Sequence, residues 1–169
     1  MPETVQQYIA RILSHSDGKD ALKLQQQAPK KVAALLRGKD RKRLAKRPAP
    51  GKWSVAEIVA HLADAEVAIG WRMRQILASP GVAVQAFDQD AWANTFQYGK
   101  RDPRQSLAAY TAQREANIVL LKSVPRSAWE NYGMHAERGQ ESIAHMIKLT
   151  AGHDLNHIKQ IEGILKNSR

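Results

Sequence analysis

Hydrophobic positions along this chain recur every three or four residues, and this spacing predicts helices almost throughout. We expect a short amphipathic helix near the N-terminus and four long helices, over residues 5–14, 20–37, 54–78, 103–123 and 140–166. Pro29 lies inside the first long helix and predicts a kink or a break there. The run Val82-Ala83-Val84 is too short and isolated to predict a strand. The pattern therefore predicts an all-α fold.

The connections between these helices indicate a bundle that is not a simple series of hairpins. Ser54 and Glu57 fit a capping box at the start of the second long helix. The connection over residues 79–102 is long for a compact domain, which is typical of a functional or partly helical segment. A connection of this length permits a crossover between the second and third long helices. We expect one four-helix-bundle domain over residues 1–169.

Positive charge is concentrated in one segment of the chain. The net charge is +10, and residues 30–52 hold ten basic side chains and one acidic side chain, so this segment carries most of the excess. Such a segment is typical either of a patch for an anionic partner or of a solvated connector. No aromatic residue is interleaved with the basic ones before Trp53, so nucleic acid is not an expected partner.

The composition excludes several other classes of protein. The chain has no cysteine, so any metal must be held by histidine, aspartate or glutamate. Neither a signal-peptide pattern nor a long apolar run is present, so we expect a cytoplasmic protein without a membrane partner. The sequence also has no phosphate-binding glycine loop, no serine or cysteine nucleophile motif and no HExxH zinc-protease motif.

Histidines at helical spacing are the strongest chemical signal in the sequence. His153 and His157 stand one turn apart, on the stripe of the last helix that should face the core. Two buried imidazoles need a partner, and either a shared metal ion or hydrogen bonds would satisfy them. His61 can supply a third ligand from the second long helix. Three imidazoles leave a fourth position open, which is typical of catalytic metal sites.

Other polar residues are weaker candidates for chemistry. The candidate catalytic residues are Asp88 and His135. Asp88 lies in the long connection and could act as a general base. His135 lies in the next connection and could reach the mouth of the site. Further carboxylates that could orient a ligand imidazole or act as a base are Asp64, Glu66, Asp90 and Asp154, although Asp154 is more typical of a surface charge. We expect Trp71 and Trp92 to be packing residues and His145 to flank the site.

Four segments of the chain together resemble the DinB/YfiT-like superfamily, in its DinB-like domain branch. These segments are Pro-Ala-Pro-Gly-Lys-Trp-Ser (48–54), Glu57 to Glu66, Phe87-Asp-Gln-Asp-Ala-Trp92 and Gly152-His-Asp-Leu-Asn-His157. The resemblance implies a four-helix bundle in up-down-down-up order, often a homodimer. It also implies a divalent metal ion held by His61, His153 and His157, with zinc or nickel the main candidates and iron or manganese the alternatives.

The resemblance leaves the reaction open. The superfamily includes S-transferases that use low-molecular-weight thiols and isomerases of the maleylpyruvate type. We therefore expect a metal-dependent enzyme, either a thiol-dependent S-transferase or a hydrolase, that acts on a small electrophilic substrate. The alternative is a non-catalytic, metal-stabilised binding protein associated with stress.

Overall fold

The computed structural model describes residues 3–167, which form helices joined by turns and one small sheet. The predicted domain, residues 1–169, also includes residues 1–2 and 168–169, which lie outside the described residues. The long helices are α2 (Ala21–Leu36), α4 (Val55–Ala78), α6 (Pro103–Ser123) and α7 (Ile143–Asn167). The shorter elements are α1 (Val5–Ser14), α3 (Arg41–Ala45), α5 (Gln89–Thr95), the 3₁₀ turns η1 (Tyr98–Lys100) and η2 (Arg126–Glu130), and the strands β1 (Ala83–Val84), β2 (Tyr132–His135) and β3 (Gly139–Ser142).

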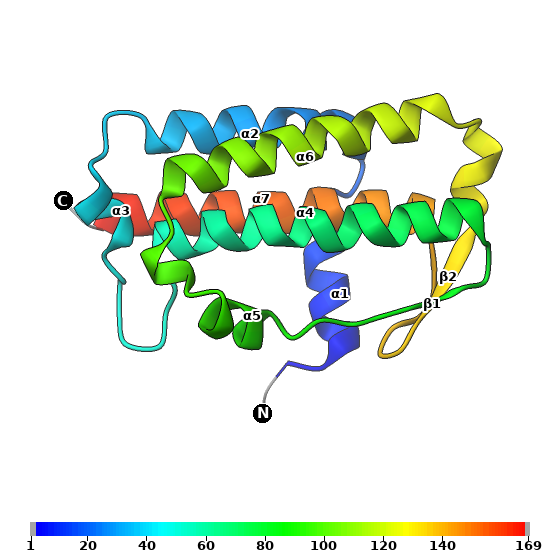
Figure 1. The fold of residues 1–169 in the computed structure, drawn as a ribbon, viewed down its shortest axis with the longest axis horizontal. Coiled ribbons are helices and arrows are strands. Elements are labelled where there is room, and N and C mark those ends of the chain that lie inside the picture. Colours follow the sequence, from blue (N-terminus) through cyan, green and yellow to red (C-terminus); the bar gives the residue numbers. More distant parts are fainter. Residues whose placement is uncertain (1–2, 168–169) are drawn as a thin grey trace.

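The four long helices form a bundle in which α2 packs against α6 and α7, and α4 packs against the same two helices. Helices α4 and α6 run in one direction and α2 and α7 run in the other (Figure 1). Because α4 and α6 are parallel, residues 79–102 return along the length of the bundle before α6 begins. The predicted four-helix bundle with its up-down-down-up order and crossover is confirmed.

The helix ends follow the signals in the sequence. Ser54 and Glu57 form the predicted capping box of α4, in which the Glu57 N–H donates to Ser54 Oγ at 3.2 Å and the Ser54 N–H donates to Glu57 Oε2 at 2.8 Å. Asp102 caps α6, and Pro103 occupies the first turn of that helix, where its missing N–H costs nothing. The long connection between α4 and α6 is partly helical, because it contains α5 and η1.

Helix α2 runs without a break through Pro29, so the predicted break is wrong. A proline in a helix leaves the carbonyl four residues earlier without its N–H donor. In this structure that carbonyl belongs to Gln25, and it accepts a hydrogen bond of 3.1 Å from Arg114 Nη1 on α6. A neighbouring helix thus supplies the donor that Pro29 lacks.

A small sheet at one end of the bundle corrects the prediction that no strand is present. β1 pairs in parallel with β2, with Ala83 opposite Met134 and Val84 opposite His135. β2 pairs in turn with β3 in an antiparallel hairpin. The pattern of residues 82–84 did not reveal β1 because the strand that pairs with it, β2, lies about fifty residues away in the chain. Helix α7 begins at Ile143 rather than at residue 140 because β3 occupies the preceding residues.

Buried polar side chains divide the core of the bundle into two apolar halves. One half is built around Val32, Ile58 and Ile161, and the other around Ile76, Leu121 and Ile143. Between them lies a set of buried polar residues that we call the buried polar layer: Gln25, Glu66, Arg114, Asn117 and Asp154. Within residues 3–167, no helix combines the length and the hydropathy needed to cross a bilayer.

Candidate metal centre

Three histidine side chains from two helices converge at the edge of the buried polar layer. His61 comes from α4, and His153 and His157 come from consecutive turns of α7. His153 Nε2 lies 3.0 Å from His61 Nε2 and 3.1 Å from His157 Nε2. His61 and His157 are buried, and His153 is partly buried. Among the described residues, the cluster contains no carboxylate and no fourth histidine.

Burial keeps these three imidazoles neutral. It lowers the pKa of His61 to about 3, and it also lowers the pKa of His153 and of His157. The charge of a neighbouring histidine acts in the same direction on His61 and His153. The cluster is therefore a set of neutral imidazoles at neutral pH, which is the form that binds a metal ion.

The hydrogen bonds of the cluster fit a cation better than they fit the protein alone. His157 Nδ1 lies 3.0 Å from Gln160 Oε1, so this nitrogen carries the hydrogen and the lone pair of Nε2 faces the cluster. His153 Nε2 lies within hydrogen-bond distance of both His61 Nε2 and His157 Nε2, and a neutral ring nitrogen can form only one of these two hydrogen bonds. Two nitrogens on one tetrahedral zinc ion would stand about 3.3 Å apart, which is close to the observed separations. The three residues fit a divalent metal ion.

Aromatic packing holds His61 in position. The Trp53 ring lies 5.1 Å from the His61 ring, measured between centroids, and also contacts Tyr98 edge to face at 6.3 Å. Trp53 directly precedes Ser54, so the capping box that starts α4 also fixes where this indole lies. The Trp-Ser pair in the sequence therefore has a structural consequence for the position of His61.

The buried polar layer supports the other two histidines. Asp154, next to His153 in the chain, pairs with Arg114 at 2.5 Å and accepts a hydrogen bond of 2.9 Å from Tyr110. Arg114 also donates to Glu66 at 2.9 Å. Asp154 was expected as a surface charge, and this expectation is wrong because its side of α7 faces α6 inside the bundle.

Charges in this layer are stable because each one has a partner. Burial opposes the charge of Arg114, but Asp154, Tyr110 and Glu66 outweigh it, so the pKa of Arg114 is raised. Burial and the Asp154 carboxylate raise the pKa of Tyr110, which therefore stays protonated and acts as a donor. The segment of α7 that carries His153 and His157 is thus tied to α6 by the ion pair between Asp154 and Arg114.

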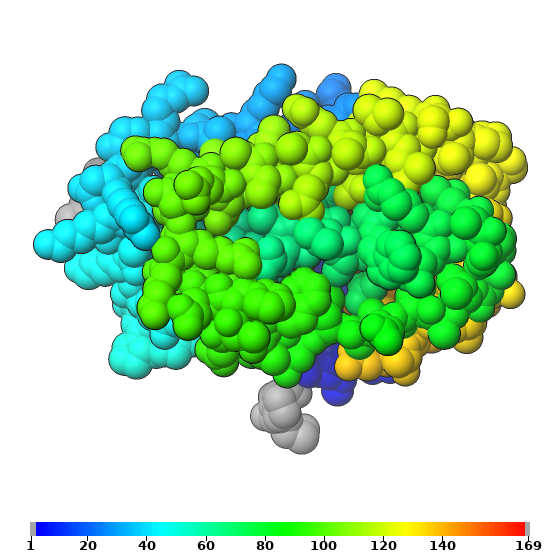
Figure 2. Space-filling view, in the orientation of Figure 1, coloured from blue at the N-terminus to red at the C-terminus, as the bar shows by residue number. Residues whose placement is uncertain are grey.

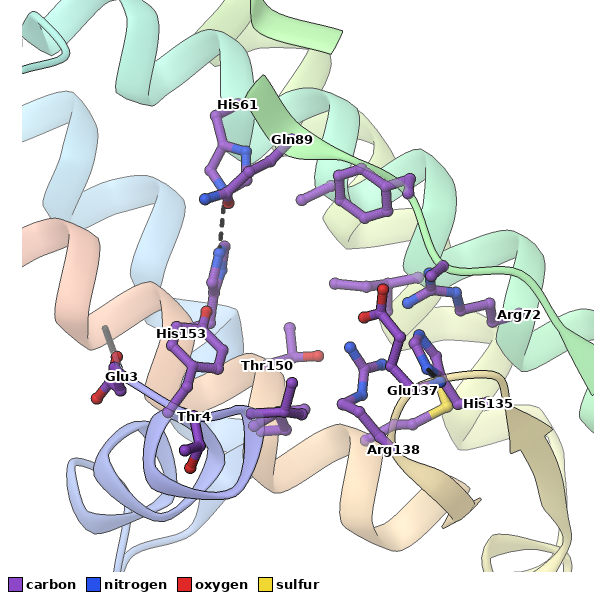
Figure 3. Close-up of a pocket in the computed structure, with 18 residues that line it drawn as sticks. Glu3, Thr4, His61, Arg72, Gln89, His135, Glu137, Arg138, Thr150 and His153 are labelled. Carbon is purple, nitrogen blue, oxygen red and sulfur yellow. Dashed lines mark hydrogen bonds between the residues drawn. The ribbon is translucent and has the colours of Figure 1, made fainter. Parts of the chain in front are cut away.

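A cavity of about 390 Å³ opens beside the cluster. Residues of α1, α4, α7, the segment after β1 and the β2–β3 hairpin line it. His61 and His153 lie at one end, and Arg72, His135 and Arg138 lie at the other (Figure 3). Its volume suits a small molecule, and an occupant would contact the histidine end directly.

The two candidate catalytic residues occupy different places. His135 lines the cavity and is buried, and burial together with Arg138 and Arg72 lowers its pKa. Asp88 does not line the cavity; its carboxylate accepts hydrogen bonds from the N–H groups of Asp90 and Ala91 and so caps α5. The geometry brings His135, but not Asp88, to the cavity.

The remaining polar and aromatic candidates have structural partners. Asp64 pairs with Arg101 at 2.8 Å, and Glu66 pairs with Arg114. His145 is partly buried outside the cluster, 3.9 Å from Glu141. Trp92 packs against Phe87 and Phe96 as expected, whereas Trp71 is 62% exposed and does not pack as expected.

Arg72 is one of the cavity residues that the sequence pattern did not single out. It lies on the face of α4 that also carries His61, Ala65 and Ile69, because these positions are separated by four, four and three residues. That shared face is the signal that would have identified it. Arg138 and Glu137 come from the hairpin, and nothing in the sequence pattern places that hairpin beside α4.

The basic segment closes one end of the bundle and contributes nothing to the cavity. Arg43 donates to the Leu165 carbonyl near the end of α7, Arg41 donates to the Lys100 carbonyl, and Arg47 pairs with Glu57. No residue of the segment 30–52 lines the cavity. Three of its arginines therefore act as connectors, and side chains of the segment extend from the surface near α3 (Figure 2).

The fold and the site together define a helical bundle of the kind that builds metal sites from side chains on facing helices. Residues 25–161 match the sequence profile of the DinB superfamily, and the chain belongs to this superfamily. The resemblance seen in the sequence is confirmed.

Several known proteins are similar to this chain. One from Oceanobacillus iheyensis, named a "putative metal-dependent hydrolase", is 26% identical over 117 residues, which are 69% of this chain and 67% of that protein. One of the same name from Halalkalibacterium halodurans is 23% identical over 137 residues, which are 81% of this chain and 80% of that protein.

A solved structure shares the fold. YfiT from Bacillus subtilis, described as "a probable metal-dependent hydrolase with an unusual four-helix bundle topology", superposes with a TM-score of 0.81 at 20% sequence identity. The match covers 87% of this chain and 85% of YfiT. At this identity the superposition shows that this chain and YfiT share a fold.

Proposed function

We propose that the protein is a metal-dependent enzyme that acts on a small electrophilic molecule bound in the cavity. The observation that carries the proposal is the convergence of three neutral imidazoles at one end of a cavity large enough for such a molecule. The names of the similar proteins from Oceanobacillus and Halalkalibacterium support hydrolysis as the reaction.

His61, His153 and His157 would hold the metal ion. Imidazole ligands favour zinc or nickel and also accept iron, whereas manganese prefers oxygen ligands. When bound, such an ion would lower the pKa of water or of a thiol and would polarise a carbonyl group of the substrate.

The chain itself holds the ligands and shapes the cavity. Gln160 accepts from His157 Nδ1, which keeps the Nε2 lone pair available, and Trp53 packs against His61. Ala65, Ile69 and Met146 give the cavity apolar walls. Of the two catalytic candidates, His135 is the one that lines the cavity, and we propose that it contacts the substrate.

A second candidate reaction at this site is the transfer of a group from the substrate to a thiol. A low-molecular-weight thiol would take the place of water as the nucleophile, and the cavity has room for a small thiol beside an electrophile. Hydrolysis and thiol transfer differ in the co-substrate alone, so a single screen with and without added thiol separates them.

A non-catalytic, metal-stabilised protein is less well supported. That role is typical of a metal whose coordination positions are all filled by the protein. Within residues 3–167, only three ligands come together, and the cavity reaches two of them. An open position beside a cavity favours catalysis.

The exposed apolar residues of α4 and α6 support a homodimer as the assembly. Val67 and Trp71 lie one turn apart on α4, and Val119 lies on α6, which packs beside α4; they are 53%, 62% and 67% exposed. Sedimentation equilibrium of the wild type and of Trp71→Glu tests this proposal. We expect a dimer that the substitution shifts toward monomer, and a monomeric wild type would contradict it.

The proposed activity is tested by a screen of the zinc-loaded and nickel-loaded protein. The substrates are p-nitrophenyl esters, anilides and alkyl halides, each assayed with and without a small thiol. We expect turnover that His61→Ala abolishes and that His145→Ala, which removes a histidine outside the cluster, retains. Turnover of equal size in all three proteins would show that the cluster is not the active site.

A further inference from the structure

Arg72 is a buried cation without an anionic partner. It is 6% exposed, and Nη2 donates to the carbonyl oxygen of Gln85 while the guanidinium lies 5.6 Å from the centre of the Phe87 ring. No carboxylate of the described residues lies within 4.0 Å of it. A buried charge without a counterion is costly. An anion bound beside this guanidinium would therefore stabilise it.

The charged groups around Arg72 do not supply a counterion in contact with it. Arg138 forms a two-point pair with Glu141, with distances of 2.7 and 2.8 Å, so each of these residues neutralises the other. Glu137 is exposed to water and forms no ion pair with Arg72 within the described chain. Burial, and then the positive charge of Arg138, lower the pKa of Arg72, and the carboxylates of Glu141 and Glu137, which form no ion pair with it, offset this only in part. Arg72 nevertheless stays charged, since an arginine titrates far above neutral pH.

His135 supplies a second unpaired donor in the same region. Its Nδ1 accepts a hydrogen bond of 3.2 Å from the Glu137 N–H, so the neutral ring carries its hydrogen on Nε2. His135 Nε2 is buried and has no hydrogen-bond partner among the described residues. A buried N–H without an acceptor is rare in folded proteins, and a ligand acceptor would satisfy it.

Both side chains line the cavity at the end opposite the three-histidine cluster (Figure 3). A molecule that fills the cavity would thus reach the cluster with one end and Arg72 and His135 with the other. Ile69 and Met146 also line the cavity and give it apolar walls.

We propose that Arg72 and His135 form a recognition site for a carboxylate group of the substrate. The assignment deepens the proposed function and rests on it, since it describes a substrate with an electrophilic centre at the histidine end and a carboxylate at the other. A guanidinium can contact both oxygens of a carboxylate, and the His135 N–H adds a third donor. The exposed Glu137 carboxylate opposes a dianion more strongly than a monoanion, which favours a carboxylate over a phosphate group.

Calorimetric titration of the zinc-loaded protein with two matched thiols tests the assignment. The probes are 4-mercaptobutyrate and 4-mercapto-1-butanol, which share the metal-binding thiol and differ in the carboxylate. We expect the wild type to bind the carboxylate probe about tenfold more tightly than the alcohol. Arg72→Gln should bind the two probes about equally, Arg72→Lys should keep part of the preference, and His135→Phe should reduce it.

Arg37→Gln is the matched control, because it removes the same charge from an exposed position at the end of α2. This variant should keep the full preference, and zinc content and circular dichroism establish that each variant is folded and loaded. Equal affinity of the wild type for the two probes, or a full preference in Arg72→Gln, would overturn the assignment and leave the proposed function intact.

A wild type that binds no zinc would instead refute the proposed metal function, and the recognition site is then tested on the metal-free protein. The probes are butyrate and butyramide, followed by nuclear magnetic resonance at the side-chain N–H groups of Arg72 and His135. Saturable shifts with butyrate alone would support the site. Their absence would overturn it.

Discussion

Arg114 on α6 donates a hydrogen bond to the carbonyl oxygen of Gln25 on α2, the acceptor that Pro29 leaves without a helical donor. The same guanidinium contacts Asp154 on α7 and Glu66 on α4. One side chain therefore links all four long helices at the level of the three-histidine cluster. The proline that would weaken an isolated helix creates an acceptor for this link.

Replacing Arg114 with methionine should destabilise the bundle strongly. Asp154 and Glu66 would remain buried without their cation, and breaking a buried ion pair in this way costs about 3–5 kcal/mol. Urea unfolding of the metal-free protein measures the change. Arg104→Met, at an exposed position of the same helix, should change the free energy of unfolding by less than about 0.5 kcal/mol. Equal effects of the two substitutions would show that the buried link is unimportant.

Gly152 allows α1 to lie directly on α7. A Cβ atom at this position would come within 2.1 Å of the Ile12 carbonyl oxygen, so Gly152→Ala must displace α1. We expect a loss of about 1–3 kcal/mol in stability, with faster hydrogen exchange in α1. Gly163→Ala on the same helix meets open space and should instead stabilise it by about 0.5–1 kcal/mol. Unchanged exchange in α1 of the Gly152 variant would contradict the close contact.

The metal-free protein should lose stability as the pH falls below about 6.5. Burial lowers the pKa of His61 to about 3, from an ordinary value of 6.5, so the unfolded chain takes up its proton first. Stability that is present above pH 6.5 is therefore lost progressively as the pH approaches 3. Between pH 7.5 and pH 5, each histidine that stays neutral in the folded protein should lower the free energy of unfolding by about 2 kcal/mol. Urea unfolding across this range measures it, and a flat profile would contradict neutral buried imidazoles.

Gln160 should influence metal affinity without contacting the metal. Its Oε1 accepts from His157 Nδ1 and so orients the ring. Removal of such an outer partner typically weakens metal binding about 10- to 100-fold. Competition with a chromophoric chelator measures the affinity of Gln160→Ala, with the neighbouring exposed Lys159→Ala as control. An affinity equal to that of the control would show that the hydrogen bond does not matter.

The sequence predicts most of the fold and the three clustered histidines. The spacing of His61 relative to Ile58 and Ala65, and of His153 relative to His157, identifies the faces that turn inward, and helix faces are set by local periodicity. The resemblance to the DinB superfamily adds the order of the helices. These features depend on residues that are near one another in the chain.

Features that depend on distant partners could not be predicted in the same way. Strand β1 exists because β2 pairs with it, and Asp154 is buried because Arg114 reaches it from α6. Helix α2 tolerates Pro29 for the same reason, since the compensating donor comes from another helix. The local propensity of a segment carries no information about contacts with distant residues, and such contacts can override that propensity.

The metal content of the protein tests the three-histidine site most directly. Untagged wild type, His153→Ala and His145→Ala would each be analysed by elemental mass spectrometry after reconstitution with zinc, nickel, iron and manganese. The three-histidine site predicts about one equivalent of metal in the wild type and in His145→Ala, and little in His153→Ala. A wild type without metal, or a His153→Ala variant with as much metal as the wild type, would show that the three histidines do not form a metal site.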